Sequence, residues 1–131
     1  MKKNVAVSLS GVVVLLGAAQ VQAAPVTNIT VNNIRSTSVT RTGTINVSGY
    51  LSPLPQTTIP AGGSDFFGSY TSGTVDAGVL YYGGCRFNWS KIQNGGVWTF
   101  SLGATPATTC VATSTVKNPF TGDYSITLTT N

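Results

Sequence analysis

Residues 74–89 read TVDAGVLYYGGCRFNW, and apolar side chains recur at every second position on both sides of a Gly-Gly pair. Alternation with a period of two is typical of β-strands, and paired glycines favour a tight turn between two of them. The run therefore predicts a β-hairpin.

The register of this hairpin depends on the length of its loop. A loop of two residues, Gly83 and Gly84, pairs Tyr82 with Cys85 and mixes apolar with polar side chains on each face. A loop of three residues pairs Tyr81 with Cys85 and makes one face uniformly apolar. Since a slip of one residue exchanges the two faces, we predict the three-residue loop, with a left-handed Gly84 in a bulge. The apolar face would then hold Val75, Ala77, Val79, Tyr81, Cys85, Phe87 and Trp89.

The same alternation recurs along the chain, and no window shows the spacing of an amphipathic helix. Segments of this kind occupy residues 29–31, 44–48, 65–70, 74–81, 85–89, 97–102, 110–116 and 124–128. They are rich in Thr and Val, which suit pleated strands, and Gly, Pro and Asn separate them. Seven to eight short strands with turns between them predict an all-β protein, a single antiparallel β-sandwich.

The N-terminus has the pattern of a secretion signal. Lys2 and Lys3 precede a nearly apolar run over residues 5–19, and residues 21–23, VQA, suit signal peptidase. The run is shorter than the roughly 20 apolar residues of a membrane-spanning helix. We therefore predict a signal peptide over residues 1–23 that is cleaved after Ala23, and a β-sandwich domain over residues 24–131 with no transmembrane segment. The Lys-Lys start is typical of a bacterial protein, and the destination is periplasmic or extracellular.

Two cysteines are present, Cys85 and Cys110. An even pair in an exported protein predicts a disulfide bond. Its loop of about 26 residues would stabilise the fold by roughly 3.5 kcal/mol in the chain-entropy model.

Several kinds of chemistry are disfavoured by composition. The chain has no His and no Glu, and its three acids, Asp65, Asp76 and Asp123, lie in separate segments. Acid–base catalysis, zinc binding and calcium binding each need groups that converge, so we expect no catalytic residue, no metal site and no cofactor. After cleavage five scattered bases face three acids, a net charge of +2. This is not the clustered basic surface of a nucleic-acid-binding protein.

Aromatic residues supply the most specific functional signal. Phe67 and Tyr82 each sit next to another aromatic residue, and two adjacent strand residues point to opposite faces. In the predicted register Tyr82 faces outward, and Tyr50 alternates away from the apolar positions 45 and 47. We expect Tyr50, Phe67 and Tyr82 to form an outward contact surface for membrane lipid, a glycan or a protein.

Five segments of the chain resemble aegerolysin-type and related small β-sandwich proteins. They are residues 29–33, 58–62, 72–81, 87–89 and 122–126, which together span most of the predicted domain. The resemblance implies a β-sandwich that binds membrane lipids and in some members assists pore formation.

Together these features predict a secreted, non-catalytic binding protein that acts through surface contacts. One alternative is a structural or adhesive subunit that self-associates by adding strands at sheet edges. A second alternative is an inhibitor of a foreign hydrolase, with the proline-rich segment 52–60 as its reactive loop.

Overall fold

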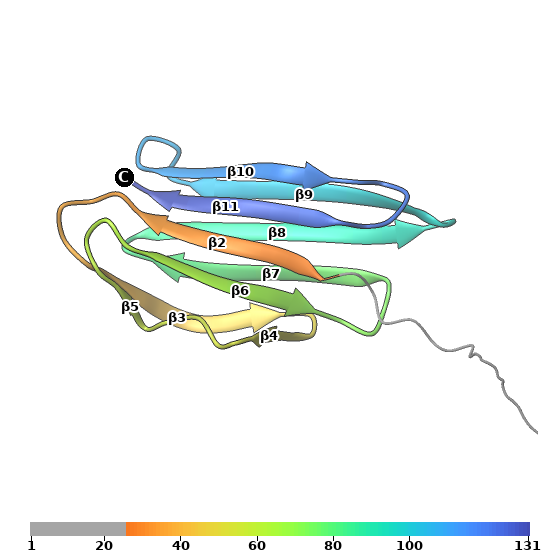
Figure 1. The fold of residues 1–131 in the computed structure, drawn as a ribbon, viewed down its shortest axis with the longest axis horizontal. Coiled ribbons are helices and arrows are strands. Elements are labelled where there is room, and N and C mark those ends of the chain that lie inside the picture. Colours follow the sequence, from red (N-terminus) through yellow and green to blue (C-terminus); the bar gives the residue numbers. More distant parts are fainter. Residues whose placement is uncertain (1–25) are drawn as a thin grey trace, which may run out of the picture.

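The computed structural model describes residues 26–131 as ten β-strands, with no helix in that range. The strands form two five-stranded sheets that pack face to face (Figure 1). The predicted all-β sandwich is confirmed. The predicted signal peptide, residues 1–23, lies outside the described residues.

The first sheet has the strand order β10-β11-β2-β6-β4. β2 runs parallel to β11, and the two lie side by side in Figure 1, orange against blue. The other neighbours in this sheet are antiparallel. The five strands are β2 (Thr27–Asn33), β4 (Tyr50–Ser52), β6 (Ser64–Tyr70), β10 (Cys110–Lys117) and β11 (Tyr124–Thr130).

The second sheet has the order β5-β3-β7-β8-β9, and all its neighbours are antiparallel. Its strands are β3 (Val39–Val47), β5 (Thr58–Ile59), β7 (Val75–Tyr82), β8 (Cys85–Asn94) and β9 (Val97–Thr105). The two shortest strands, β4 and β5, were not among the predicted segments. They flank the proline-rich segment, and strands of two or three residues are too short to show an alternating pattern.

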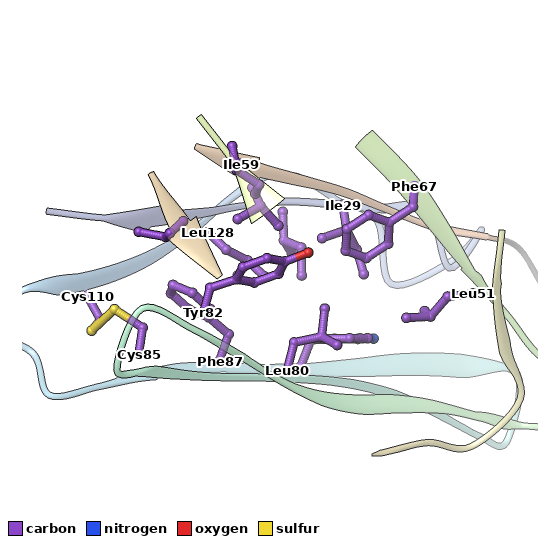
Figure 2. Close-up of a cluster of buried hydrophobic side chains, with 14 of the residues drawn as sticks. Ile29, Leu51, Ile59, Phe67, Leu80, Tyr82, Cys85, Phe87, Cys110 and Leu128 are labelled. Atoms are coloured by element: carbon purple, nitrogen blue, oxygen red, sulfur yellow. A yellow bond between two sulfur atoms is a disulfide. The ribbon is translucent and has the colours of Figure 1, made fainter. Parts of the chain in front are cut away.

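The hydrophobic core fills the space between the sheets, and Figure 2 shows side chains from both sheets meeting there. Ile29, Ile126 and Leu128 enter from the first sheet, and Leu80 and Phe87 enter from the second. The disulfide between Cys85 on β8 and Cys110 on β10 joins one sheet to the other. The predicted cross-link is confirmed.

The predicted register of the β7–β8 hairpin is wrong. Tyr82 pairs with Cys85 across a two-residue loop. Both loop residues have positive φ, 55° at Gly83 and 85° at Gly84, as type I′ turns require. On β8 the predicted residues Cys85, Phe87 and Trp89 are buried. On β7 the buried apolar side chains are Leu80 and Tyr82, whereas the predicted Val75, Ala77, Val79 and Tyr81 lie on the other face.

Two polar side chains on the buried face explain this outcome. Asp76 and Lys91 are paired in register, and both are fully buried. The Asp76 carboxylate accepts hydrogen bonds from the hydroxyls of Thr27 and Ser69. Lys91 Nζ donates to the carbonyl oxygen of Gly122 at 2.9 Å, and it lies 5.3 Å from the centre of the Trp98 ring. These partners offset the loss of hydration, so the buried face tolerates charge.

Candidate binding surface

The three aromatic residues expected on one surface do not lie together. Tyr50 is 61% exposed, as predicted, but Phe67 and Tyr82 are buried. Figure 2 shows both rings between the two sheets. The Tyr82 hydroxyl donates to the carbonyl oxygen of Gln56, and burial raises the pKa of this phenol to about 12. The expectation that Phe67 and Tyr82 face solvent is therefore wrong. The register of β6 and of the β7–β8 hairpin turns both side chains inward.

Phe66 takes the outward place that was expected for Phe67. On β6 the side chains of Asp65, Phe67 and Ser69 point inward, and this turns Phe66 to the outer face, where it is 65% exposed. The inward set is polar at both ends, so hydrophobicity alone does not show which of two adjacent phenylalanines is buried.

Tyr50 and Tyr70 form a stacked pair on the same outer face. They are paired in register between β4 and β6, and their ring centres lie 5.2 Å apart with an angle of 11° between the planes. Gly68 lies between this pair and Phe66 along β6. A Cβ at Gly68 would come within 2.8 Å of the Tyr70 ring and of Val26. The glycine therefore lets the Tyr70 ring lie close against the sheet.

These side chains border a cleft of about 320 Å³. We use the name outer aromatic cleft for this cleft together with the adjacent Tyr50–Tyr70 stack. The exposed part of its lining is mostly apolar or hydroxylated. The members are Asn28, Ile29, Thr30, Ser52, Pro53, Phe66, Phe67 and Gly68, with Tyr50 and Tyr70 beside them.

The outer face around the cleft carries no charged side chain at the outward positions of β2, β4, β6 and β11. Register and burial place only hydroxyl, amide, glycine and aromatic residues there. Besides the cleft, the outward residues are Asn32, Ser64, Ser125, Thr127 and Thr129. These outward positions therefore offer no charged group for an ion pair.

The segment after Ser52 is held in place beside the cleft. The Asp65 carboxylate accepts hydrogen bonds from the backbone N–H groups of Gln56 and Phe66, at 2.7 and 2.9 Å. The Arg41 guanidinium donates to the carbonyl oxygen of Pro55. Leu54 follows Pro53, which lines the cleft, and is 74% exposed, so this segment presents an aliphatic side chain to solvent.

The three aspartates lie in different settings. Asp65 caps this segment, Asp76 is sealed in the core, and Asp123 precedes β11 in an exposed turn. Burial lowers the pKa of the Lys91 ammonium, and the nearby Asp76 and Asp123 charges partly offset that effect. Within residues 26–131 there is no group of three or more His, Cys, Asp or Glu side chains that could hold a metal ion.

No known protein family matches the sequence, and neither does any curated protein. A similar fold is found in the crystal structure of IP-1A from Alcaligenes faecalis, with a TM-score of 0.54. The two chains are 17% identical, and the match covers 82% of this chain and 92% of that one. At this level of identity the likeness concerns the fold alone.

The disulfide fits a periplasmic or extracellular protein, because cysteines stay reduced in most cytosolic compartments. Across the described part of the chain, no helix has the length and apolar character needed to cross a bilayer.

Proposed function

We propose that this protein is an exported, non-catalytic binding protein that attaches to membrane surfaces through the outer aromatic cleft. The observation that carries the proposal is the gathering of exposed Phe66 and the Tyr50–Tyr70 stack around one cleft on an uncharged face.

The chemistry of the cleft suits the boundary between lipid headgroups and acyl chains. Tyrosine rings favour that boundary because they combine an apolar body with a polar hydroxyl. A phenylalanine that moves from water into the acyl region contributes roughly 1.5–3 kcal/mol, and Leu54 adds further apolar surface. The hydroxyl and amide groups around the cleft can bond to headgroup oxygens. Because the face is uncharged, zwitterionic lipid is the expected target.

The edges of the sheets favour surface binding over assembly by strand addition. β4 and β5, which end the two sheets on one side, have only three and two residues. On the other side, β9 and β10 lie next to each other. Short edge strands and neighbouring edges limit pairing with a second chain. The part of β3 beyond Thr40 has no partner in β5, and its register with β7 is irregular there, which disfavours a regular added strand.

The test is co-sedimentation of the protein with phosphatidylcholine vesicles. We expect uptake by the wild type and a loss of affinity of about tenfold or more in Phe66→Ala, since most of the exposed ring would leave the membrane. Tyr50→Ala should lose affinity too, because it breaks the stack. The matched control is Phe120→Ala, which removes an aromatic side chain that is 80% exposed in the turn between β10 and β11.

Two outcomes would overturn the proposal. One is a wild type that no vesicle takes up, whatever its lipid composition. The other is a Phe120→Ala variant that loses as much affinity as Phe66→Ala, because the contact would then not be centred on the cleft. Binding to a neutral glycan but not to vesicles would give the same cleft a carbohydrate ligand and would also refute membrane attachment.

A further inference from the structure

A second, polar hollow lies on the outer face of the other sheet, where β3 separates from β7. The register between these strands shifts between Thr42 and Asn46, and Gly43 in the shifted segment has a φ of 71°. Two adjoining hollows of about 400 and 430 Å³ open there. Both are lined by Asn46, Val79 and Arg86. We call the two hollows together the Arg86 groove.

Arg86 gives this groove a positive charge with few internal partners. Its side chain is exposed, and its one hydrogen bond within residues 26–131 goes from Nη1 to Asn88 Oδ1, at 3.3 Å. No aspartate lines either hollow. Most of the guanidinium N–H groups therefore face solvent and can donate to an anion.

Amide and aromatic groups surround this charge. Asn88 lines the first hollow, Tyr81 lines the second, and Asn46 lines both. Within the described chain the Asn46 side chain makes no hydrogen bond, so both its donor and its acceptor are available. Asn88 retains its own N–H₂ donors. The Tyr81 ring is half-buried and offers an apolar surface beside these polar groups.

Two glycines keep the groove open. A Cβ at Gly103 on β9 would lie 2.7 Å from the Asn88 side-chain oxygen and would push that amide out of place. A Cβ at Gly43 would lie 3.3 Å from the Tyr81 ring, in a backbone conformation that side chains rarely adopt. Small residues thus stand where larger ones would disturb Asn88 and Tyr81.

We propose that the Arg86 groove binds an acidic saccharide, a sugar unit that carries a carboxylate. Arg86 pairs with the carboxylate, for which its planar fork of donors is suited. Asn46 and Asn88 exchange hydrogen bonds with sugar hydroxyls, and the Tyr81 ring packs against the apolar side of the sugar ring. In pockets for small ligands, a few placed polar groups, which can include a charged residue, fix the orientation of the ligand. This site lies on the opposite sheet from the outer aromatic cleft and does not depend on it.

The test is an NMR titration of the ¹⁵N-labelled protein with glucuronate, and with glucose and inorganic phosphate in separate arms. We expect saturable shifts at the amides of Asn46, Tyr81 and Arg86 with glucuronate. Weaker effects are expected from glucose, which lacks the charge, and from phosphate, which lacks the ring. Arg86→Gln should weaken glucuronate binding about tenfold or more, the usual scale for losing a charge-assisted hydrogen bond. Lys117→Gln is the matched control, since it removes one exposed positive charge on β10.

The absence of saturable shifts at these residues through the millimolar range would overturn the proposal. So would equal affinity for glucuronate and phosphate, or equal losses in Arg86→Gln and Lys117→Gln. The spectrum of each variant shows directly whether it is folded. Because Phe66→Ala leaves this sheet untouched, the titration can succeed where vesicle binding fails, and the reverse also holds.

Discussion

Among the buried glycines of the described residues, Gly78 has the least room for a side chain. A Cβ there would lie 2.3 Å from Cζ2 of Trp89 and 2.7 Å from a methyl carbon of Val47. The indole of Trp89 therefore covers the bare backbone of β7, on the buried face of the sheet. Because Trp89 is among the largest fully buried side chains, this contact positions a large part of the core.

Gly78→Ala should lower the free energy of unfolding by about 1–3 kcal/mol, because the added methyl group forces a packed ring to move. The control is Gly73→Ala, where the nearest atom to a new Cβ is a flexible Thr71 hydroxyl at 3.8 Å. That variant should stay within about 0.5 kcal/mol of the wild type. Urea denaturation measures both, and equal effects would contradict the close contact at Gly78.

Ionisation of the buried Tyr82 phenol should destabilise the protein in alkali. Its pKa is raised from 10.0 to about 12, with burial as the main cause, so the folded state holds the phenolic proton more tightly than the unfolded state. The corresponding stability is fully present below pH 10 and is lost as the pH rises towards 12. Tyr82→Phe cannot ionise, and its stability should fall less steeply over this range. Burial raises the pKa of Tyr124 as well, so part of the slope should remain.

Urea denaturation of both proteins on either side of this transition provides the check. At neutral pH the variant should be weaker by about 1 kcal/mol, because it lacks the hydrogen bond to Gln56. Parallel stability losses in the two proteins above pH 10 would show that Tyr82 does not carry the effect.

At the scale of elements, the β7–β8 hairpin shows where sequence reasoning succeeds and where it fails. Alternation located both strands, but Tyr82 was placed in a three-residue loop, whereas it is the last residue of β7. The register was wrong because the apolar face was assumed to be the buried one, whereas Asp76 and Lys91 are buried with partners from β2, β6 and the turn before β11. Those partners are distant in sequence. The Gly-Gly pair was the local signal that indicated the correct two-residue loop.

The sequence predicted only part of the candidate site, again because the deciding contacts are distant along the chain. Tyr50 was placed outward correctly, but its neighbours in space are Tyr70 and Phe66. Choosing between Phe66 and Phe67 requires the pairing of β6 with β2, in which Phe67 lies opposite Ile29. This pairing joins segments that are far apart along the chain, and a period of two fits either choice.

The disulfide acts between elements, since β8 and β10 belong to different sheets. Reduction should lower the free energy of unfolding by about 2–4 kcal/mol, because the unfolded chain regains the freedom of a closed loop. Urea denaturation with and without reductant measures the loss. The double variant Cys85→Ser with Cys110→Ser should have the same free energy of unfolding as the reduced protein, and adding reductant should not change it. A reduced protein as stable as the oxidised one would contradict this role.

At the scale of the whole molecule, charge and aromatic surface are separated. The outward positions around the cleft are uncharged, whereas Arg86 lies on the opposite sheet and Lys117 at the end of β10. Binding to phosphatidylcholine vesicles should therefore change by less than about twofold between low and high salt, because the outward strand positions around the cleft carry no charge for salt to screen. Co-sedimentation at several NaCl concentrations measures this. A steep fall with salt would show that basic residues, and not the cleft, hold the membrane.

The fold class followed from the sequence because it needs only the period of the pattern and the cysteine pair. The order of strands in the sheets could not be predicted in the same way. β2 and β11 come from opposite ends of the described chain, and they pair in parallel where an antiparallel arrangement was expected. Local alternation contains no information about such a distant partner.

This pairing also constrains the order in which the molecule can be completed. β2 fills the central place of its sheet, between β6 and β11, and β11 is the last of the described strands along the chain. A growing chain that stops short of residue 124 leaves one side of β2 without a neighbour and the core without Ile126 and Leu128. The native core is therefore complete only when residues 124–130 lie beside β2, so the first and last strands of the described chain depend on each other.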